Sequence, residues 1–301
     1  MIDRANIEEF KTNLCGQLIQ PGDEDYDEAC KIYNAMIERC PAMIARCADV
    51  ADVMAAVNFA REHDELVAIR GGGHNGPGLG TCDDGLVIDM SSIKYTRVDP
   101  QVRTVQVGGG CTWGDVDHAT HAFGLATPSG VVSTTGVGGL TLGGGHGYLT
   151  RKYGLTIDNL LSADIVLADG RFVTVSAEEN QDLFWAIRGG GGNFGVVTEF
   201  RFQLHPVHTI VGGPTLWHQE QTTEVMQWYR DFMQEAPEDL YGFFAILTVP
   251  PGPPFPEELH LQKMCGVVWC YTGTEAEAAE VFQPIREFGP PAMYVSLSPP
   301  F

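Results

Sequence analysis

Three clusters of glycine constrain the fold of this 301-residue chain more than any other feature of its sequence. They occupy residues 71–80, 130–147 and 189–195. Glycine adopts backbone conformations that a Cβ forbids, and it lets amide groups approach a ligand closely. The first and third clusters contain the G-x-G-x-x-G pattern of dinucleotide-binding proteins, which carries that meaning only when a helix follows. Strand-like sequence follows both clusters, so we expect tight bends in a fold of another kind.

The second cluster, residues 130–147, is the longest. Glycine is costly inside a packed helix or strand, so we expect an irregular backbone here. The segment lacks the G-K-[ST] ending of a P-loop. Val and Leu are interleaved with the glycines where a disordered linker would carry Ser and charge. We therefore predict that this backbone lies directly against a large flat ligand.

Charge and cysteine content limit the partners and the compartment. Acidic residues number 39 against 18 lysines and arginines, a formal net charge of −21. That charge would repel nucleic acid and anionic lipid, so we expect neither as a partner. The N-terminus has no signal-peptide pattern, and no apolar stretch approaches the ~20 residues that span a bilayer. The 8 cysteines include no C-x-x-C pair, and we expect a cytoplasmic protein.

Two H-x-x-H pairs raise the question of a metal site. His118 and His121 lie in a stretch of helical pattern, whereas Pro206 interrupts the pair formed by His205 and His208. Neither pair has cysteine or carboxylate partners at ligand spacing. We predict that the chain binds no metal.

The remaining pattern indicates helices and strands in both halves of the chain. Residues 42–69 read as a small βαβ unit, and helical patterns over 6–20 and 27–37 precede it. Later helices are expected over 219–234 and 274–288, separated by longer strands. Hydrophobic residues make up 44% of the chain, enough for one large core or two moderate ones.

We predict an α+β fold with two domains. The first covers residues 1–206 and has two subdomains, about 1–100 and 101–206. The second covers residues 207–301 and is an antiparallel sheet backed by helices.

Several motifs in order resemble the berberine-bridge-enzyme-like group of FAD-linked oxidases, in the vanillyl-alcohol-oxidase superfamily. They are R-G-G-G-H-N at 70–75, the glycine segment 130–147, R-K-Y-G-L at 151–155, D-N at 158–159, and F-W-A-I-R-G-G-G-G-N-F-G-V-V at 184–197. The resemblance spans roughly residues 20–210. It implies a two-part PCMH-type FAD-binding domain followed by a partial substrate domain.

The resemblance also implies which residues contact the cofactor. The pyrophosphate of FAD would lie on the loop at 71–75, and the isoalloxazine along 130–147. The expected contacts are Arg70, Gly71, Gly72, Gly73, His74, Asn75, Gly80, Ser129, Gly130, Val132, Gly138, Gly139, Thr141, Gly143, Gly144, Gly147, Asn159 and Val197.

His74 is expected to carry the flavin covalently. In the resembling family the matching histidine is joined to the flavin 8α-methyl carbon, and a neutral imidazole is nucleophilic near pH 7. From the loop alone, a histidine that merely completes a turn is an equally good interpretation. Many plant members add a second bond through a cysteine at the position of Val132. Valine has no sulfur, so the sequence predicts one covalent bond, through His74 only.

His146 is the candidate catalytic residue within the chain. It occupies the position where plant relatives carry an active-site tyrosine, so it either faces the substrate side of the flavin or caps a glycine turn. The resembling family continues through more sheet beyond the position of Phe301. We therefore expect the main catalytic base beyond Phe301 and the chain to be C-terminally incomplete.

The function that the resemblance implies is an FAD-dependent oxidase. A sugar, alcohol or amine C–H would give hydride to flavin N5, and O₂ would then be reduced to H₂O₂. A second hypothesis is a flavin-holding fragment that does not turn over. A third, a nicotinamide-linked reductase, is weaker because the sequence shows no separate Rossmann unit. The sequence leaves the substrate and the oligomeric state open.

Overall fold

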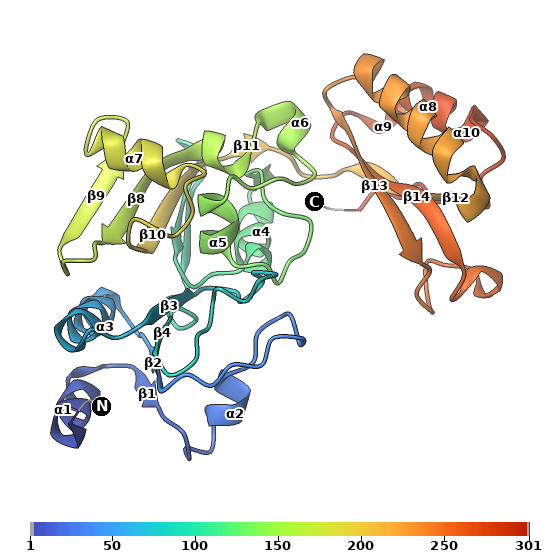
Figure 1. The fold of residues 1–301 in the computed structure, drawn as a ribbon. Helices are drawn as coiled ribbons and strands as arrows, with labels where there is room; N and C mark the ends of the chain where they lie inside the picture. The colour runs from blue at the N-terminus through green and yellow to red at the C-terminus, as the bar shows by residue number, and fades with distance from the viewer. Residues whose placement is uncertain (1–2, 300) are drawn as a thin grey trace. The chain divides into compact units, whose positions relative to one another are not determined.

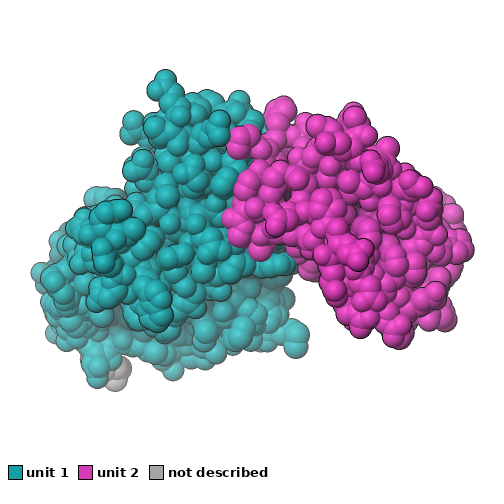
Figure 2. All heavy atoms as spheres, turned by 90° about the horizontal axis from the view of Figure 1, so that it is seen from above, with its two compact units in different colours: residues 1–147, 155–205 teal, residues 148–154, 206–301 magenta. Residues whose placement is uncertain are grey.

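Two compact units make up the chain in the computed structural model, which describes residues 3–299 and 301. Unit 1 comprises Met1–Gly147 and Leu155–His205, and unit 2 comprises Tyr148–Gly154 and Pro206–Phe301 (Figure 2). The predicted α+β class is confirmed, since each unit combines helices with sheet (Figure 1).

The first sheet of unit 1 has the strand order β1-β2-β4-β3. Strands β2, β4 and β3 run parallel to one another. Strand β1, at the other edge of the sheet, pairs antiparallel with β2. Helix α3 makes the crossover from β2 to β3, which parallel strands require. Asp49 caps this helix by accepting a hydrogen bond from the Asp52 amide, and Asp64 ends it in the left-handed conformation. The bounds are α1 (Arg4–Asn13), β1 (Gln17–Ile19), α2 (Tyr26–Ala29), β2 (Met43–Arg46), α3 (Val50–His63), β3 (Val67–Arg70) and β4 (Leu86–Asp89).

The second sheet of unit 1 is antiparallel, with the order β5-β6-β10-β8-β9. Its core contains Trp113, Phe200 and Phe202, all fully buried. The bounds are β5 (Thr96–Asp99), β6 (Thr104–Gly108), α4 (Trp113–His121), β7 (Leu125–Ala126), α5 (Val137–Leu142), η1 (Thr156–Asn159), β8 (Leu160–Val166), β9 (Phe172–Ser176), α7 (Gln181–Ile187), β10 (Val196–Gln203) and β11 (His205–Pro206).

The described part of unit 2 is a four-stranded antiparallel sheet, order β13-β14-β12-β15, with four α-helices. Trp217, Trp269 and Phe282 are buried in its core, where helix α8 packs with its Val225. The bounds are α6 (Thr150–Tyr153), β12 (Val211–His218), η2 (Gln219–Gln221), α8 (Thr222–Glu235), β13 (Leu240–Thr248), η3 (Glu257–Leu259), β14 (Lys263–Tyr271), α9 (Glu275–Val281), α10 (Gln283–Glu287) and β15 (Met293–Tyr294).

The segment Tyr148–Gly154 belongs to unit 2, although the sequence interpretation left it within residues 1–206. The Arg151 guanidinium donates to the Ala236 carbonyl at 2.6 Å, and Lys152 forms an ion pair with Asp239. These partners lie more than 80 residues away along the chain. Because no local sequence pattern indicates these distant contacts, sequence periodicity could not assign the segment to unit 2.

Two predicted helices near the N-terminus were too long. Helix α1 stops at Asn13, because Leu18 and Ile19 are needed in the first sheet as β1. Helix α2 ends at Ala29, well short of residue 37. The chain after it instead follows the first glycine cluster, where the Tyr33 amide donates to the Gly73 carbonyl at 3.1 Å.

Two further predictions of helix content were wrong. Residues 137–142 form α5 despite two adjacent glycines, because Val137, Thr141 and Leu142 are buried in the core of unit 1. The helix expected over 274–288 is divided into α9 and α10, with Pro284 in the first turn of α10. Proline has no amide hydrogen to continue the preceding helix.

Candidate cofactor-binding site

The three glycine clusters meet in unit 1. A Cβ on Gly72 would lie 2.3 Å from the Gly136 nitrogen, so the first and second clusters touch backbone to backbone. The Leu142 carbonyl accepts hydrogen bonds from the Gly189 amide at 3.1 Å and the Gly191 amide at 2.9 Å. The third cluster is therefore hydrogen-bonded to the end of α5 (Val137–Leu142), which is part of the second cluster.

A groove of about 500 Å³ lies beside the first two clusters. This volume falls within the range of small-molecule sites. The carboxyl ends of the parallel strands β2, β3 and β4 contribute Arg46, Arg70 and Asp89 to its lining. The lining residues are Glu28, Ala29, Lys31, Ile32, Tyr33, Arg46, Arg70, Gly71, Gly72, Gly73, His74, Asp89, Ser91 and Thr134.

His74 lies half-buried in this groove, where residues of two other segments orient its ring. Its Nε2 is 3.0 Å from the Thr134 hydroxyl, and its Nδ1 is 3.5 Å from the Thr135 hydroxyl. The Tyr33 ring stacks on the imidazole at 4.0 Å between centroids. Burial lowers the pKa of His74 from its ordinary value of 6.5, although a hydrogen bond from the imidazole to the Thr134 backbone opposes that shift. The imidazole is therefore neutral at pH 7 and keeps a nitrogen lone pair.

Helix α5 offers an open glycine face and an unused hydroxyl. A Cβ on Gly139 would meet no heavy atom within 4 Å, and Gly143 is also exposed. The Thr141 hydroxyl of the same helix is fully buried and has no hydrogen-bond partner among the described residues, and neither has that of Thr127. Open backbone and unpartnered buried hydroxyls are what a flat polar ligand such as a flavin requires, so these residues fit the group.

Other predicted glycines are needed for packing. A Cβ on Gly147 would lie 1.9 Å from the Ser129 carbonyl oxygen, and one on Gly130 would lie 2.6 Å from the Leu140 side chain. Gly80 is buried against Arg70, and Gly138 faces the Phe200 ring. Packing therefore explains the glycines at 130 and 147, whereas a Cβ at 80 or 138 would make only ordinary contacts at 3.7 Å.

The remaining predicted contacts are dispersed. Asn75 is exposed, and its side chain accepts from the Leu79 amide at 2.9 Å. Val132 is 42% exposed, whereas Val197 is buried in the core of unit 1. Asn159 is buried and lies 2.6 Å from His205 Nε2.

Gly144 and His146 complete the predicted set. Gly144 adopts a φ of +111°, a conformation that favours glycine. His146 is exposed on the same glycine segment.

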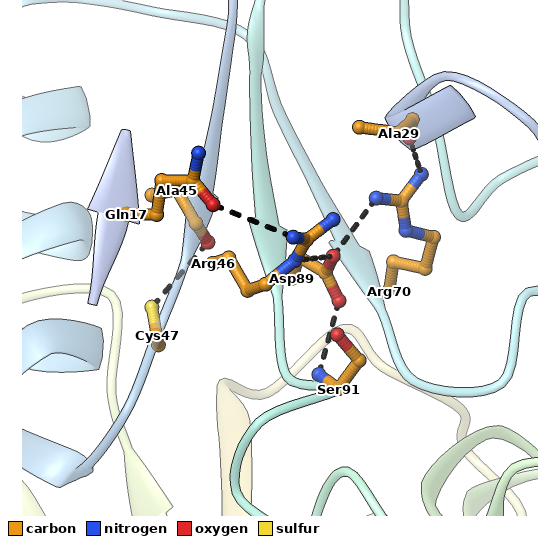
Figure 3. A network of polar contacts seen from close by, with 8 residues as sticks. All are labelled: Gln17, Ala29, Ala45, Arg46, Cys47, Arg70, Asp89 and Ser91. Atoms are coloured by element: carbon orange, nitrogen blue, oxygen red, sulfur yellow. Dashed lines mark hydrogen bonds and ion pairs between the residues drawn. The ribbon is translucent and has the colours of Figure 1, made fainter. Parts of the chain in front are cut away.

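Arg70 is buried. Its guanidinium donates to the Ala29 carbonyl at 2.7 Å and to Asp89 at 3.0 Å (Figure 3). Asp89 also lies 3.5 Å from Arg46. Sequence reasoning missed Arg46, Asp89 and Tyr33. A signal for the first two was present, since the apolar runs M-I-A, V-A-I and L-V-I each end in a charged residue.

No group of three or more metal-ligating side chains gathers in the part of the chain that the structure describes. His118 and His121 both lie on α4, and no ligand from another segment joins them. Nor does any described helix combine the length and the apolar composition needed to cross a membrane.

Comparisons with known proteins identify the class of this site. A family model described as an FAD binding domain matches residues 41–176. An FAD-linked oxidoreductase of Dictyostelium discoideum is 37% identical over 290 residues, which cover 95% of this chain and 61% of the relative. The chain thus spans about three fifths of that relative.

Solved structures of FAD-linked oxidases have the same fold as this chain. The crystal structure of 6-hydroxy-D-nicotine oxidase from Arthrobacter nicotinovorans superposes with a TM-score of 0.86 at 30% identity, covering 96% of this chain and 62% of that one. A chitooligosaccharide oxidase gives a TM-score of 0.83 at 27% identity, covering 98% and 61%.

The fold and the matched region define unit 1 as an FAD-binding domain of the PCMH type. Within that class, the chain matches FAD-linked oxidoreductases of the berberine-bridge-enzyme-like group over about three fifths of their length, as its motifs indicated.

Proposed function

We propose that this chain is the FAD-binding part of an oxidase that holds its flavin through one covalent bond to His74. The observation that carries the proposal is the setting of His74, a neutral, half-buried imidazole in a groove where two glycine clusters meet. Bound FAD would supply hydride acceptance at N5 and electron transfer to O₂, yielding H₂O₂.

The residues of unit 1 would bind and orient the cofactor. The backbone at Gly71, Gly72 and Gly73 lets a diphosphate approach the groove closely. Tyr33 and Thr134 hold the His74 ring in one orientation. The open face of α5 at Gly139 would lie along the flavin.

The substrate we propose is a small molecule with an oxidisable C–H beside nitrogen or oxygen. Support comes from relatives whose names specify oxidation of a nicotine derivative and of chitooligosaccharides. His146, exposed on the glycine segment, is the candidate for substrate contact within the described residues.

The covalent bond is tested by denaturing the purified protein with heat and acid. We expect the yellow colour to stay with the polypeptide in the wild type and to be lost from His74→Ala. His118→Ala is the matched control, because His118 is exposed on α4 and outside the groove. Flavin released from denatured wild type would contradict the covalent proposal.

Turnover needs its own assay. Peroxide formation with panels of sugars, alcohols and amines should identify a substrate class if the chain is active alone. The second candidate function is flavin binding without turnover, and the chain spans about three fifths of the relatives it matches. A yellow protein that forms no peroxide with any panel would support this second candidate.

A further inference from the structure

Three charged residues stand side by side at the carboxyl ends of three parallel strands. Arg46 of β2 and Arg70 of β3 both pair in register with Asp89 of β4, which lies between them. All three line the groove (Figure 3). Ligands of sheets with parallel strands commonly bind outside this end of the strands.

The two arginines differ in exposure and in the length of their hydrogen bonds. The Arg70 side chain is 7% exposed, and short hydrogen bonds to Ala29 and Asp89 hold its guanidinium. The Arg46 side chain is 32% exposed, and its contacts with Asp89 at 3.5 Å and Gln17 at 3.4 Å are both long. Five N–H groups belong to each guanidinium, so Arg46 retains donors that face the groove.

The described residues that line the groove carry more positive than negative side-chain charges. Among the described lining residues, Lys31 pairs with Glu28, and Arg70 pairs with Asp89. Arg46 is the remaining cation in this set, in a chain whose formal net charge is −21. Arg46 shares the Asp89 carboxylate with Arg70, so its charge is only partly compensated. Such an arginine beside a glycine loop is suited to a phosphate, which accepts bidentate hydrogen bonds from a guanidinium.

We propose that Arg46 binds the diphosphate of the dinucleotide cofactor, and that Asp89 is a positioning residue that holds Arg46 toward the groove while it fixes Arg70 in the interior. The inference rests on the proposed function and names a binding residue within the same site. It assigns the phosphate contact to Arg46, whereas the sequence interpretation assigned a cofactor contact to Arg70. The carboxylate of Asp89 has one oxygen for both arginines and another for the Ser91 amide at 3.0 Å.

The test measures reversible binding, so it is made in full-length His74→Ala protein, where no covalent bond can trap the ligand. FAD and riboflavin are titrated into this parent, into Arg46→Gln and into Arg46→Lys. Arg97→Gln is the matched control, since Arg97 is exposed on β5 and lies outside the groove. ADP and adenosine serve as competitors that differ only in phosphate.

We expect Arg46→Gln to weaken binding of FAD and of ADP about tenfold and to leave riboflavin and adenosine unchanged. Arg46→Lys should recover part of the loss, and Arg97→Gln should bind as the parent does. The thermal midpoint of Arg46→Gln should match the parent, because the contacts it loses are long and partly exposed.

Equal FAD affinity in Arg46→Gln and the parent overturns this inference and leaves the proposed function intact. Equal losses for FAD and riboflavin also overturn it, because the substitution would then act on the whole site. If the wild type carries no flavin and the parent binds none, the proposed function fails as well.

Discussion

The protonation state of His74 is set by its surroundings. Burial lowers its pKa below the ordinary 6.5, and only the neutral imidazole can attack an electrophilic carbon. Covalent flavin attachment should therefore continue at pH values where a solvated histidine would already be protonated.

We expect the fraction of covalent flavin formed from apoprotein and FAD to fall with a midpoint below pH 6.5. The measurement is the absorbance retained after acid precipitation, with reactions stopped at fixed times across a pH series. Tyr33→Leu removes the stacked ring and should slow attachment at every pH. A midpoint above 6.5 would show that the folded protein favours the imidazolium.

Asp89 is a second residue whose environment makes a prediction. Burial favours its protonated form, but the nearby Arg70 charge and hydrogen bonds from Ser91 hold its pKa below the ordinary 3.8. Removing one partner of a buried pair leaves the other charge uncompensated, so Asp89→Asn should lower the free energy of unfolding by about 3 kcal/mol or more.

The pH dependence has a definite sign. Because the folded-state pKa is lowered, the carboxylate stabilises the protein above about pH 4 and loses that contribution as the pH falls below it. Urea unfolding at pH 7 and at pH 3.5 should show a smaller difference between wild type and Asp89→Asn at the lower pH. A variant as stable as the wild type at pH 7 would contradict this account.

The elements that build the site differ in how well the sequence foretold them. Strands β2, β3 and β4 follow from apolar runs that end in turns, and α3 from its periodicity. Helix α5 was not predicted, because its two adjacent glycines are unfavourable in a helix. Burial of Val137 and Leu142 stabilises the helix nevertheless. Tertiary contacts likewise override the helical pattern after Ala29.

Glycines in these elements divide into two kinds, which substitution can separate. Gly136→Ala would place a Cβ 2.2 Å from the Gly72 nitrogen, so we expect loss of stability together with loss of flavin. Gly139→Ala meets no atom within 4 Å and replaces glycine in a helix, so the apoprotein should gain up to about 1 kcal/mol.

Flavin binding should nevertheless weaken in Gly139→Ala if the ring lies along α5. Thermal unfolding of the apoproteins and FAD titration of the same samples give the two quantities. Gly76→Ala provides the control, because its Cβ would also meet open space but lies outside α5. Unchanged FAD affinity in Gly139→Ala would remove this helix from the proposed flavin contact.

At the level of the whole molecule, each unit has its own hydrophobic core. The residues proposed to bind the cofactor belong to unit 1, and a ligand stabilises only the state that binds it. The sequence indicated two domains from the change of pattern near residue 206, but it could not assign Tyr148–Gly154, whose partners are distant in sequence.

We expect calorimetry of the apoprotein to show two unfolding transitions. FAD should raise the midpoint of the transition that belongs to unit 1. Three of the 5 tryptophans, Trp217, Trp228 and Trp269, lie in unit 2, so tryptophan fluorescence reports mainly its transition. A single transition that shifts as a whole with FAD would show that the units unfold together.

The backbone crossing of Gly72 and Gly136 has a consequence for assembly. These positions are 136 − 72 = 64 residues apart in the chain, and one belongs to the bend after β3 while the other precedes α5. The crossing can close only when the bend after β3 and the segment before α5 are both in place. Newly made chains should therefore turn yellow late, and colour in a growing culture would count finished molecules rather than synthesised ones.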